Sequence, residues 1–150
     1  MKFSLNRETL LKPLLLVSGA VERKSTLPIL GNILFDIKGQ SLTLTATDLE
    51  LEMVAHAEID NQGEDGNVTI PARKLLDICK SLPEGSMLNF NAEEDSVKLS
   101  SGRSKYSLST LSADDFPNIE EWKGDVEFKL LKSELLRLIE STHFSMANQD

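Results

Sequence analysis

One pattern of apolar residues occurs three times in the sequence, and this repeat constrains the fold more than any other feature. In residues 3–17, two alternating apolar residues precede a group of apolar residues at helical spacing, and the pattern recurs 65 and 125 residues later. Period-two alternation is typical of a half-buried strand, and the spacing i, i+1, i+4 is typical of an amphipathic helix. Each copy therefore predicts a strand followed by a helix. The matching positions are Phe3, Val68 and Phe128; Leu5, Ile70 and Leu130; Leu10, Leu75 and Leu135; and Leu14, Cys79 and Ile139.

The stretches that follow the first two copies also resemble each other. Residues 29–59 contain three alternating segments separated by turn residues such as Lys38 and Gly39, and residues 86–111 contain three more. Alternating segments bounded by turn residues predict antiparallel strands. The repeated unit is therefore one strand, one helix and three strands, about sixty residues long. We expect an α+β fold in which the helices cover one face of antiparallel sheets.

The repeat also predicts how the chain is divided. Two units, residues 1–66 and 67–117, are expected to form one domain, with helices at about 7–21 and 72–81 lying side by side. Residues 118–125 are acidic and flanked by proline, so we expect a linker there. The third copy occupies residues 126–150 and includes only a strand and a helix. We therefore expect this segment to be the start of a second domain in a longer protein.

The net charge of −8 argues, taken alone, against nucleic acid as a partner. The charges are unevenly distributed, however. The expected helical segments 6–24, 71–80 and 132–143 together hold nine basic and five acidic residues, whereas the rest of the chain holds seven basic and nineteen acidic residues. This distribution predicts a basic helical layer and an acidic strand layer, so two readings stay open: a phosphate-binding helical face, and a protein-interaction module without a DNA role.

No residue is a convincing catalytic candidate. The single cysteine, Cys79, excludes an internal disulfide and fits a reducing cytoplasm, and its repeat position matches Leu14, which predicts a core thiol. Neither histidine, His56 or His143, lies at a metal-ligand spacing from Cys79. No run of apolar residues is long enough to span a membrane. We therefore assign no catalytic residue, no metal ligand and no cofactor.

One acidic pattern supports an alternative function. Asp48, Glu50 and Glu52 alternate with apolar residues and would share one face of a strand, where they could hold a hard cation. A metal-dependent enzyme that uses this face is one alternative. The interleaved apolar residues explain the same spacing as a strand with one solvated face. Replacing all three carboxylates by alanine would abolish such an enzyme and leave a binding protein unaffected.

Several blocks closely resemble one family over the length of the chain. The blocks TLPILGN, TDLELEM, IPARKLLDICKSLPEG, SGRSKYSLSTLSADDFPN and FSMANQD are similar to bacterial DNA polymerase III beta subunits, the sliding clamps. The resemblance implies a non-catalytic processivity factor: a head-to-tail dimeric ring of three similar domains per subunit, whose helices line a pore around duplex DNA. It also implies that this chain is the first domain and the opening of the second.

The resemblance assigns DNA contacts to the pore side. These would come from the loop after the first helix, from the start of the second helix, and from a loop near the end of this chain. The implied DNA-binding residues are Arg23, Lys24, Arg73, Asn148 and Gln149.

The resemblance also implies the partners of the ring. A second clamp subunit would pair with the strand in 101–108, DNA polymerase III and the clamp loader would bind the ring, and their main pocket would lie in later domains, outside this chain. The apolar part of the subunit contact is expected to be exposed, and its cations are expected to face acidic residues of the partner. The implied interface residues are Lys74, Arg103, Lys105, Tyr106 and Leu108.

Overall fold

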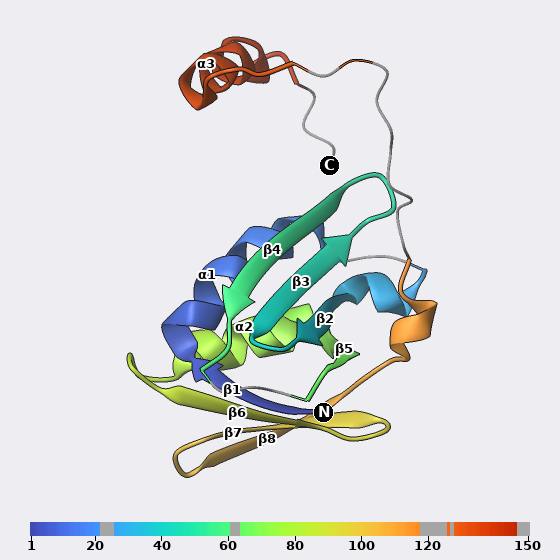
Figure 1. Ribbon diagram of the computed structural model, residues 1–150. Coiled ribbons are helices and arrows are strands. Elements are labelled where there is room, and N and C mark those ends of the chain that lie inside the picture. The colour runs from blue at the N-terminus through green and yellow to red at the C-terminus, as the bar shows by residue number, and fades with distance from the viewer. Residues whose placement is uncertain (22–25, 61–63, 118–125, 127, 147–150) are drawn as a thin grey trace. The chain divides into compact units, whose positions relative to one another are not determined.

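The computed structural model describes residues 1–21, 26–60, 64–117, 126 and 128–146, which form two compact units, residues 1–119 and 120–150. The first unit contains eight strands and two α-helices, and the second contains one α-helix, α3 (Lys132–His143), within these described ranges (Figure 1). The elements of the first unit are β1 (Lys2–Asn6), α1 (Arg7–Val17), β2 (Asn32–Lys38), β3 (Ser41–Thr47), β4 (Glu52–Glu58), β5 (Gly66–Pro71), α2 (Ala72–Ser81), β6 (Met87–Ala92), β7 (Ser96–Ser101) and β8 (Ser104–Ser109), with short 3-10 helices at Ser18–Ala20, Pro28–Gly31 and Ala113–Asp115.

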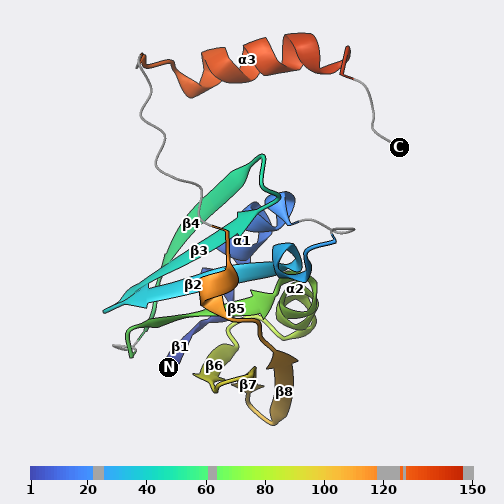
Figure 2. The same cartoon turned by 90° about the vertical axis from the view of Figure 1, so that its right-hand side faces the viewer.

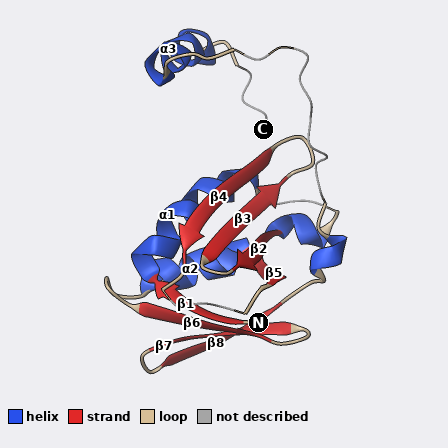
Figure 3. Ribbon diagram, in the orientation of Figure 1, coloured by secondary structure: helices blue, strands red, loops and turns tan. Residues whose placement is uncertain are grey.

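The predicted unit of one strand, one helix and three strands is confirmed twice, in β1-α1-β2-β3-β4 and β5-α2-β6-β7-β8. These two repeats, which together form the first unit, exchange their first strands, and the sequence repeat did not predict this exchange. One antiparallel sheet has the order β1-β6-β7-β8 and the other has the order β4-β3-β2-β5 (Figure 3). The exchange is symmetrical, because Phe3 lies opposite Phe90 in one sheet and its repeat equivalent, Val68, lies opposite Phe35 in the other. Each sheet is therefore completed by the first strand of the other repeat.

Helix α1 begins at a capping residue and ends sooner than expected. The side chain of Asn6 accepts a hydrogen bond from the Glu8 backbone N–H at 3.1 Å, which satisfies one of the free donors of the first turn. The predicted helix over 7–21 ends at Val17 and continues only as a 3-10 turn. The Ser18 hydroxyl donates to the Leu14 carbonyl oxygen at 2.6 Å, a side-chain bond that competes with the helical ladder. Helix α2 spans 72–81, as predicted.

The repeat positions form one core shared by both sheets and both helices. Leu10, Leu14, Leu75 and Cys79 are all fully buried, so the helical spacing of the repeat marks the core face of α1 and of α2. Both helices lie on the same side of the β4-β3-β2-β5 sheet, as predicted (Figure 2). The sheets contribute three phenylalanine rings that meet in the core, and those of Phe3 and Phe90 stack with centroids 4.6 Å apart.

Chain segment 111–117 is fixed against the face of the β4-β3-β2-β5 sheet that points away from the helices. The Thr69 hydroxyl donates to the Leu111 carbonyl oxygen at 2.7 Å and accepts from the Leu111 N–H and the Asn32 amide, each at 3.0 Å. Phe116 is buried in a small separate apolar cluster with Ile29 and Leu30. The Thr69 hydroxyl therefore connects segment 111–117 to the β4-β3-β2-β5 sheet.

Replacing Thr69 by valine should lower the free energy of unfolding by about 1–3 kcal/mol, because the change keeps the shape and leaves the buried Asn32 amide and the partly buried N–H and C=O groups of Leu111 without their partner. Thr45→Val is the matched control. Thr45 lies in the same cross-strand row, two strands away through Leu34, and is only half buried. Urea unfolding of both variants provides the measurement. Equal effects of the two changes would contradict a special role for the Thr69 hydroxyl.

Candidate nucleic-acid and subunit interfaces

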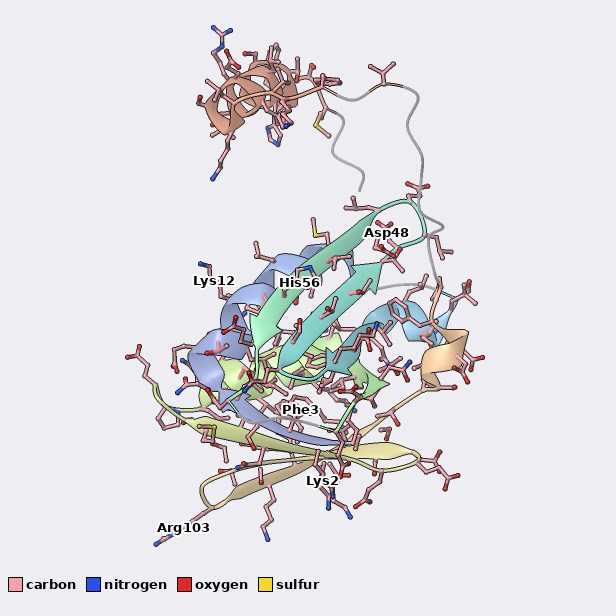
Figure 4. The ribbon with its side chains drawn as sticks, viewed as in Figure 1. Lys2, Phe3, Lys12, Asp48, His56 and Arg103 are labelled. Atoms are coloured by element: carbon pink, nitrogen blue, oxygen red, sulfur yellow. The ribbon has the colours of Figure 1, made fainter. Side chains whose placement is uncertain are left out.

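Among the described residues, the outward faces of α1 and α2 carry four exposed cationic side chains. Lys12, Arg73, Lys74 and Lys80 are exposed on these helices, and Lys12 projects from α1 in Figure 4. Arg7 is different, because its Nε donates to the Cys79 carbonyl oxygen at 2.6 Å and one terminal nitrogen lies 2.8 Å from a carboxylate oxygen of Glu8. Arg7 therefore connects the start of α1 to the end of α2 and is not a free cation.

The carboxylate of Glu8 reinforces the same junction. Besides the contact with Arg7, its two oxygens accept from the Gly85 backbone N–H at 3.2 Å, in the turn that follows α2. The side-chain hydrogen bond from Arg7 is the main reason that the pKa of Glu8 lies below its ordinary value. Arg7 and Glu8 at the start of α1 thus stabilise the contact between the two repeats of the first unit.

A shallow groove lies where the end of α1 meets the start of α2. Its lining includes Ser18 and Val21 from the α1 side, and Arg73 and Asp77 from α2. The N-terminal turn of α2 carries a partial positive charge that adds to the charge of Arg73. The predicted contacts Arg23, Lys24, Asn148 and Gln149 lie outside the described residues. The Arg73 side chain is thus exposed to solvent, and it lines the same groove as Val21, the last described residue before the loop that follows α1.

The strand layer is not uniformly acidic, contrary to the distribution expected from the sequence. Acidic residues occur in several turns, among them Asp48–Leu51 and Glu93–Asp95, and the first of these is marked by Asp48 in Figure 4. In contrast, Lys2, Lys98 and Lys105 are exposed on the face of β1-β6-β7-β8 that points away from the core. A count of charges by segment could not show that these lysines share one face, because the register between distant strands brings them together.

The expected subunit contact lies at the end of a sheet, because β8 is an edge strand in the order β1-β6-β7-β8. Arg103, Lys105 and, on α2, Lys74 are exposed, and Tyr106 is half buried. The expectation that Leu108 is exposed is wrong, since its side chain is only 4% exposed and belongs to the core. Leu108 lies opposite the buried Val97, so the pleat of β8 directs it inward.

The geometry expected for the metal alternative is also wrong. Asp48 and Glu50 both lie in the turn between β3 and β4, and only Glu52 belongs to a strand. Its carboxylate accepts from the backbone N–H groups of Glu50 and Leu51 at 2.9 and 2.7 Å, and these bonds hold the pKa of Asp48 below its ordinary value. Across the described parts of the chain, no group of three or more His, Cys, Asp or Glu side chains is arranged to hold a metal ion.

The surroundings of Cys79 and His56 do not resemble a catalytic site. Cys79 is fully buried, and burial raises the pKa of its thiol to about 11, so the nucleophilic thiolate is scarce at neutral pH. His56 is exposed on β4, and its Nδ1 lies 3.2 Å from the hydroxyl of its cross-strand neighbour Thr43. None of the described helices has the length and apolar character needed to cross a membrane.

Sequence comparison relates the chain to one family. Residues 1–120 match the family described as DNA polymerase III beta subunit, N-terminal domain. The chain is 50% identical to a beta sliding clamp of Pseudomonas aeruginosa and 51% identical to one of Escherichia coli strain K12, over all 150 residues in both cases. It spans 41% of the length of each of these relatives.

Structural comparison leads to the same family. A crystal structure of a DnaN sliding clamp (DNA polymerase III subunit beta) from Pseudomonas aeruginosa, bound to griselimycin, is similar with a TM-score of 0.93 at 50% identity. A Caulobacter crescentus pol III beta structure is similar with the same score at 33% identity. Both matches cover 100% of this chain, and they cover 41% and 40% of the respective clamp chains.

The position of Leu108 leads to a testable difference between two neighbours on β8. Leu108→Ala should lower the free energy of unfolding by about 2–5 kcal/mol, because it opens a cavity in the core. Tyr106→Ala should cost clearly less, because Tyr106 is half buried. Chemical denaturation of the isolated chain measures both. A small loss for Leu108→Ala, no larger than that for Tyr106→Ala, would contradict the placement of Leu108 in the core.

Proposed function

The chain belongs to the family of DNA polymerase III beta subunits, and on that premise we propose that it forms the first part of a DNA sliding clamp. The observation that carries the proposal is the whole-chain match, at about 50% identity and a TM-score of 0.93, to clamps whose fold it shares. In this function the protein is a non-catalytic processivity factor of the cytoplasm. It tethers DNA polymerase III to duplex DNA as a head-to-tail dimeric ring.

The helices provide the DNA side of the ring. Exposed Lys12, Arg73 and Lys80 on α1 and α2 support this assignment, and we extend it to Arg23, Lys24, Asn148 and Gln149 by family resemblance. A closed ring holds DNA topologically, so its phosphate contacts need not be strong. Weak contacts that exchange readily permit sliding, whereas acidic turns such as Glu93–Asp95 disfavour DNA where they lie.

Edge strand β8 provides the contact with a second subunit. An edge strand has a row of unpaired backbone groups, to which a strand of another chain can add. The exposed Arg103 and Lys105, with Lys74 on α2, would then attract acidic groups of the partner, and Tyr106 would supply apolar area. Leu108 would contribute indirectly, by holding β8 against the core.

Residues 126–150 are proposed to begin the second clamp domain, after a linker at 118–125. In α3, the positions that match the buried or partly buried apolar residues of α1 and α2 are about half exposed: Leu135 at 48%, Leu136 at 48% and Ile139 at 51%. An amphipathic helix of this kind needs a sheet to cover it. In the relatives, which are more than twice as long as this chain, further residues are available for such a sheet.

The competing reading, a protein-interaction module without a DNA role, is favoured only by the net charge of −8. It predicts that removing cations from the helical side leaves DNA loading unchanged. The experiment on Lys24 and Gln149 therefore distinguishes the two functions.

Lys24→Ala combined with Gln149→Ala, in the full-length protein, should weaken loading or retention on DNA irrespective of DNA sequence. The slope of log K against log salt should fall by about one unit for the charged phosphate contact of Lys24, because the neutral Gln149 side chain releases no counterion. A double variant at exposed positions of the sheets, Lys38→Ala with Asn67→Ala, removes the same chemical groups and serves as the control. Unchanged loading and an unchanged salt slope would contradict the pore assignment.

The 150-residue chain by itself should show no preference for circular over linear DNA. Topological retention requires a closed ring, and the family architecture uses three domains per subunit. Gel filtration of the chain with nicked circular DNA, before and after linearisation, provides the measurement. Retention that disappears on linearisation would show that this chain closes a ring without further domains.

A further inference from the structure

The face of the β1-β6-β7-β8 sheet that points away from the core contains an open groove across all four strands. The floor of the groove is one cross-strand row, and its two walls are the neighbouring rows, whose side chains point outward because the pleat alternates. The floor row consists of Phe3, Phe90, Leu99 and Tyr106; one wall consists of Lys2, Asn91, Lys98 and Ser107; the other consists of Ser4, Asn89, Ser100 and Lys105.

The dimensions of the groove follow from sheet geometry. Rows on the same face of a strand are two residues apart, so the walls are separated by roughly 7 Å. Four strands spaced about 4.8 Å apart give a length of roughly 14 Å, which an extended peptide of about four or five residues spans. The groove therefore suits one extended polypeptide segment that crosses the strands.

The charge of the groove is opposite to that of the whole chain. Lys2, Lys98 and Lys105 are exposed on its walls, although the net charge of the chain is −8. Lys98 is already paired, because its Nζ lies 2.5 Å from Glu93 Oε1, and the Asn91 amide also donates to this oxygen at 3.4 Å. Among the described residues, no carboxylate lies within ion-pair distance of the Lys2 or Lys105 ammonium group. Two of the three cations are thus available to acidic groups of a ligand.

The wall chemistry favours a polypeptide over a nucleic acid. Asparagine and serine side chains both donate and accept hydrogen bonds, which suits the backbone of an extended peptide. Single-stranded nucleic acids normally stack on exposed aromatic rings, whereas the rings of Phe3 and Phe90 are buried in the core. Figure 4 shows Phe3 directed into the domain and Lys2 directed away from it.

We propose that this groove binds an extended acidic segment of a partner protein. The lysines supply long-range attraction and the amide and hydroxyl groups hold the peptide backbone. The site lies on the face opposite to the helices and does not depend on the proposed DNA contacts. Lys105 and Tyr106 are shared with the proposed subunit edge, so the test uses Lys2 and Lys98 instead.

The test uses the 150-residue chain and a fluorescein-labelled eight-residue peptide of alternating glutamate and serine. Fluorescence anisotropy should show binding that weakens as salt is raised. Lys2→Glu combined with Lys98→Glu should weaken binding by about tenfold or more, because attraction becomes repulsion. The control, Lys12→Glu with Lys80→Glu on the helices, makes the same change of net charge and should alter binding less than about twofold.

Backbone amide chemical shifts of the unaltered chain provide a second measurement, which does not depend on whether the variants fold. Addition of the peptide should shift Asn91 and Ser100 in the groove and leave Thr45 and Val54 of the other sheet unchanged. The proposal is overturned by absence of peptide binding, by an equal loss in both double variants, or by shifts confined to other surfaces. Tighter binding of a labelled single-stranded octanucleotide in the same groove would also overturn it, in favour of nucleic acid.

Discussion

The exchange of first strands between the two repeats is the constraint on which the rest of the first unit depends. Strand β1 completes the sheet of the second repeat and β5 completes the sheet of the first, so neither repeat has a complete sheet by itself. The chain crosses between sheets at the start of each helix, which brings α1 and α2 together. Arg7 reinforces this crossing through its backbone N–H, 2.9 Å from the Ser86 oxygen, and its side chain, bonded to Cys79. The two repeats must therefore fold as one cooperative domain.

This arrangement separates three surfaces that different partners can use. The helices present their cations on one side, where we propose DNA contacts, with Arg73 in the groove between them. The sheet β1-β6-β7-β8 presents its lysine-lined groove on the face away from the core, and β8 presents an edge to a second subunit. Because a strand alternates its side chains between faces, one strand can serve the core through Leu108 and the outer surface through Lys105.

Charge in this protein is informative only when it is assigned to a surface. A net charge of −8 favours solubility and disfavours non-specific DNA binding, but it averages over faces that have opposite character. Individual charged residues also differ in availability. Arg7 and Glu8 are engaged with each other and with backbone groups, and Asp48 caps a turn, whereas Lys12 and Arg73 are open to solvent. A count of charges by segment treats these residues alike and therefore does not show which charges are available to a partner.

By itself, the sequence determined the repeat, the core face of each helix and the order of strands and helices, because residues such as Leu10 and Leu75 report burial through local periodicity. It also predicted the family through its specific blocks, and the comparisons confirm that family. The strand exchange, the row that joins Lys2 to Lys98, the turn at Asp48 and the inward direction of Leu108 were decided only by the tertiary structure. Periodicity states that one face of an element is apolar, but the element that covers that face, and the register between distant strands, depend on contacts between residues far apart in the chain.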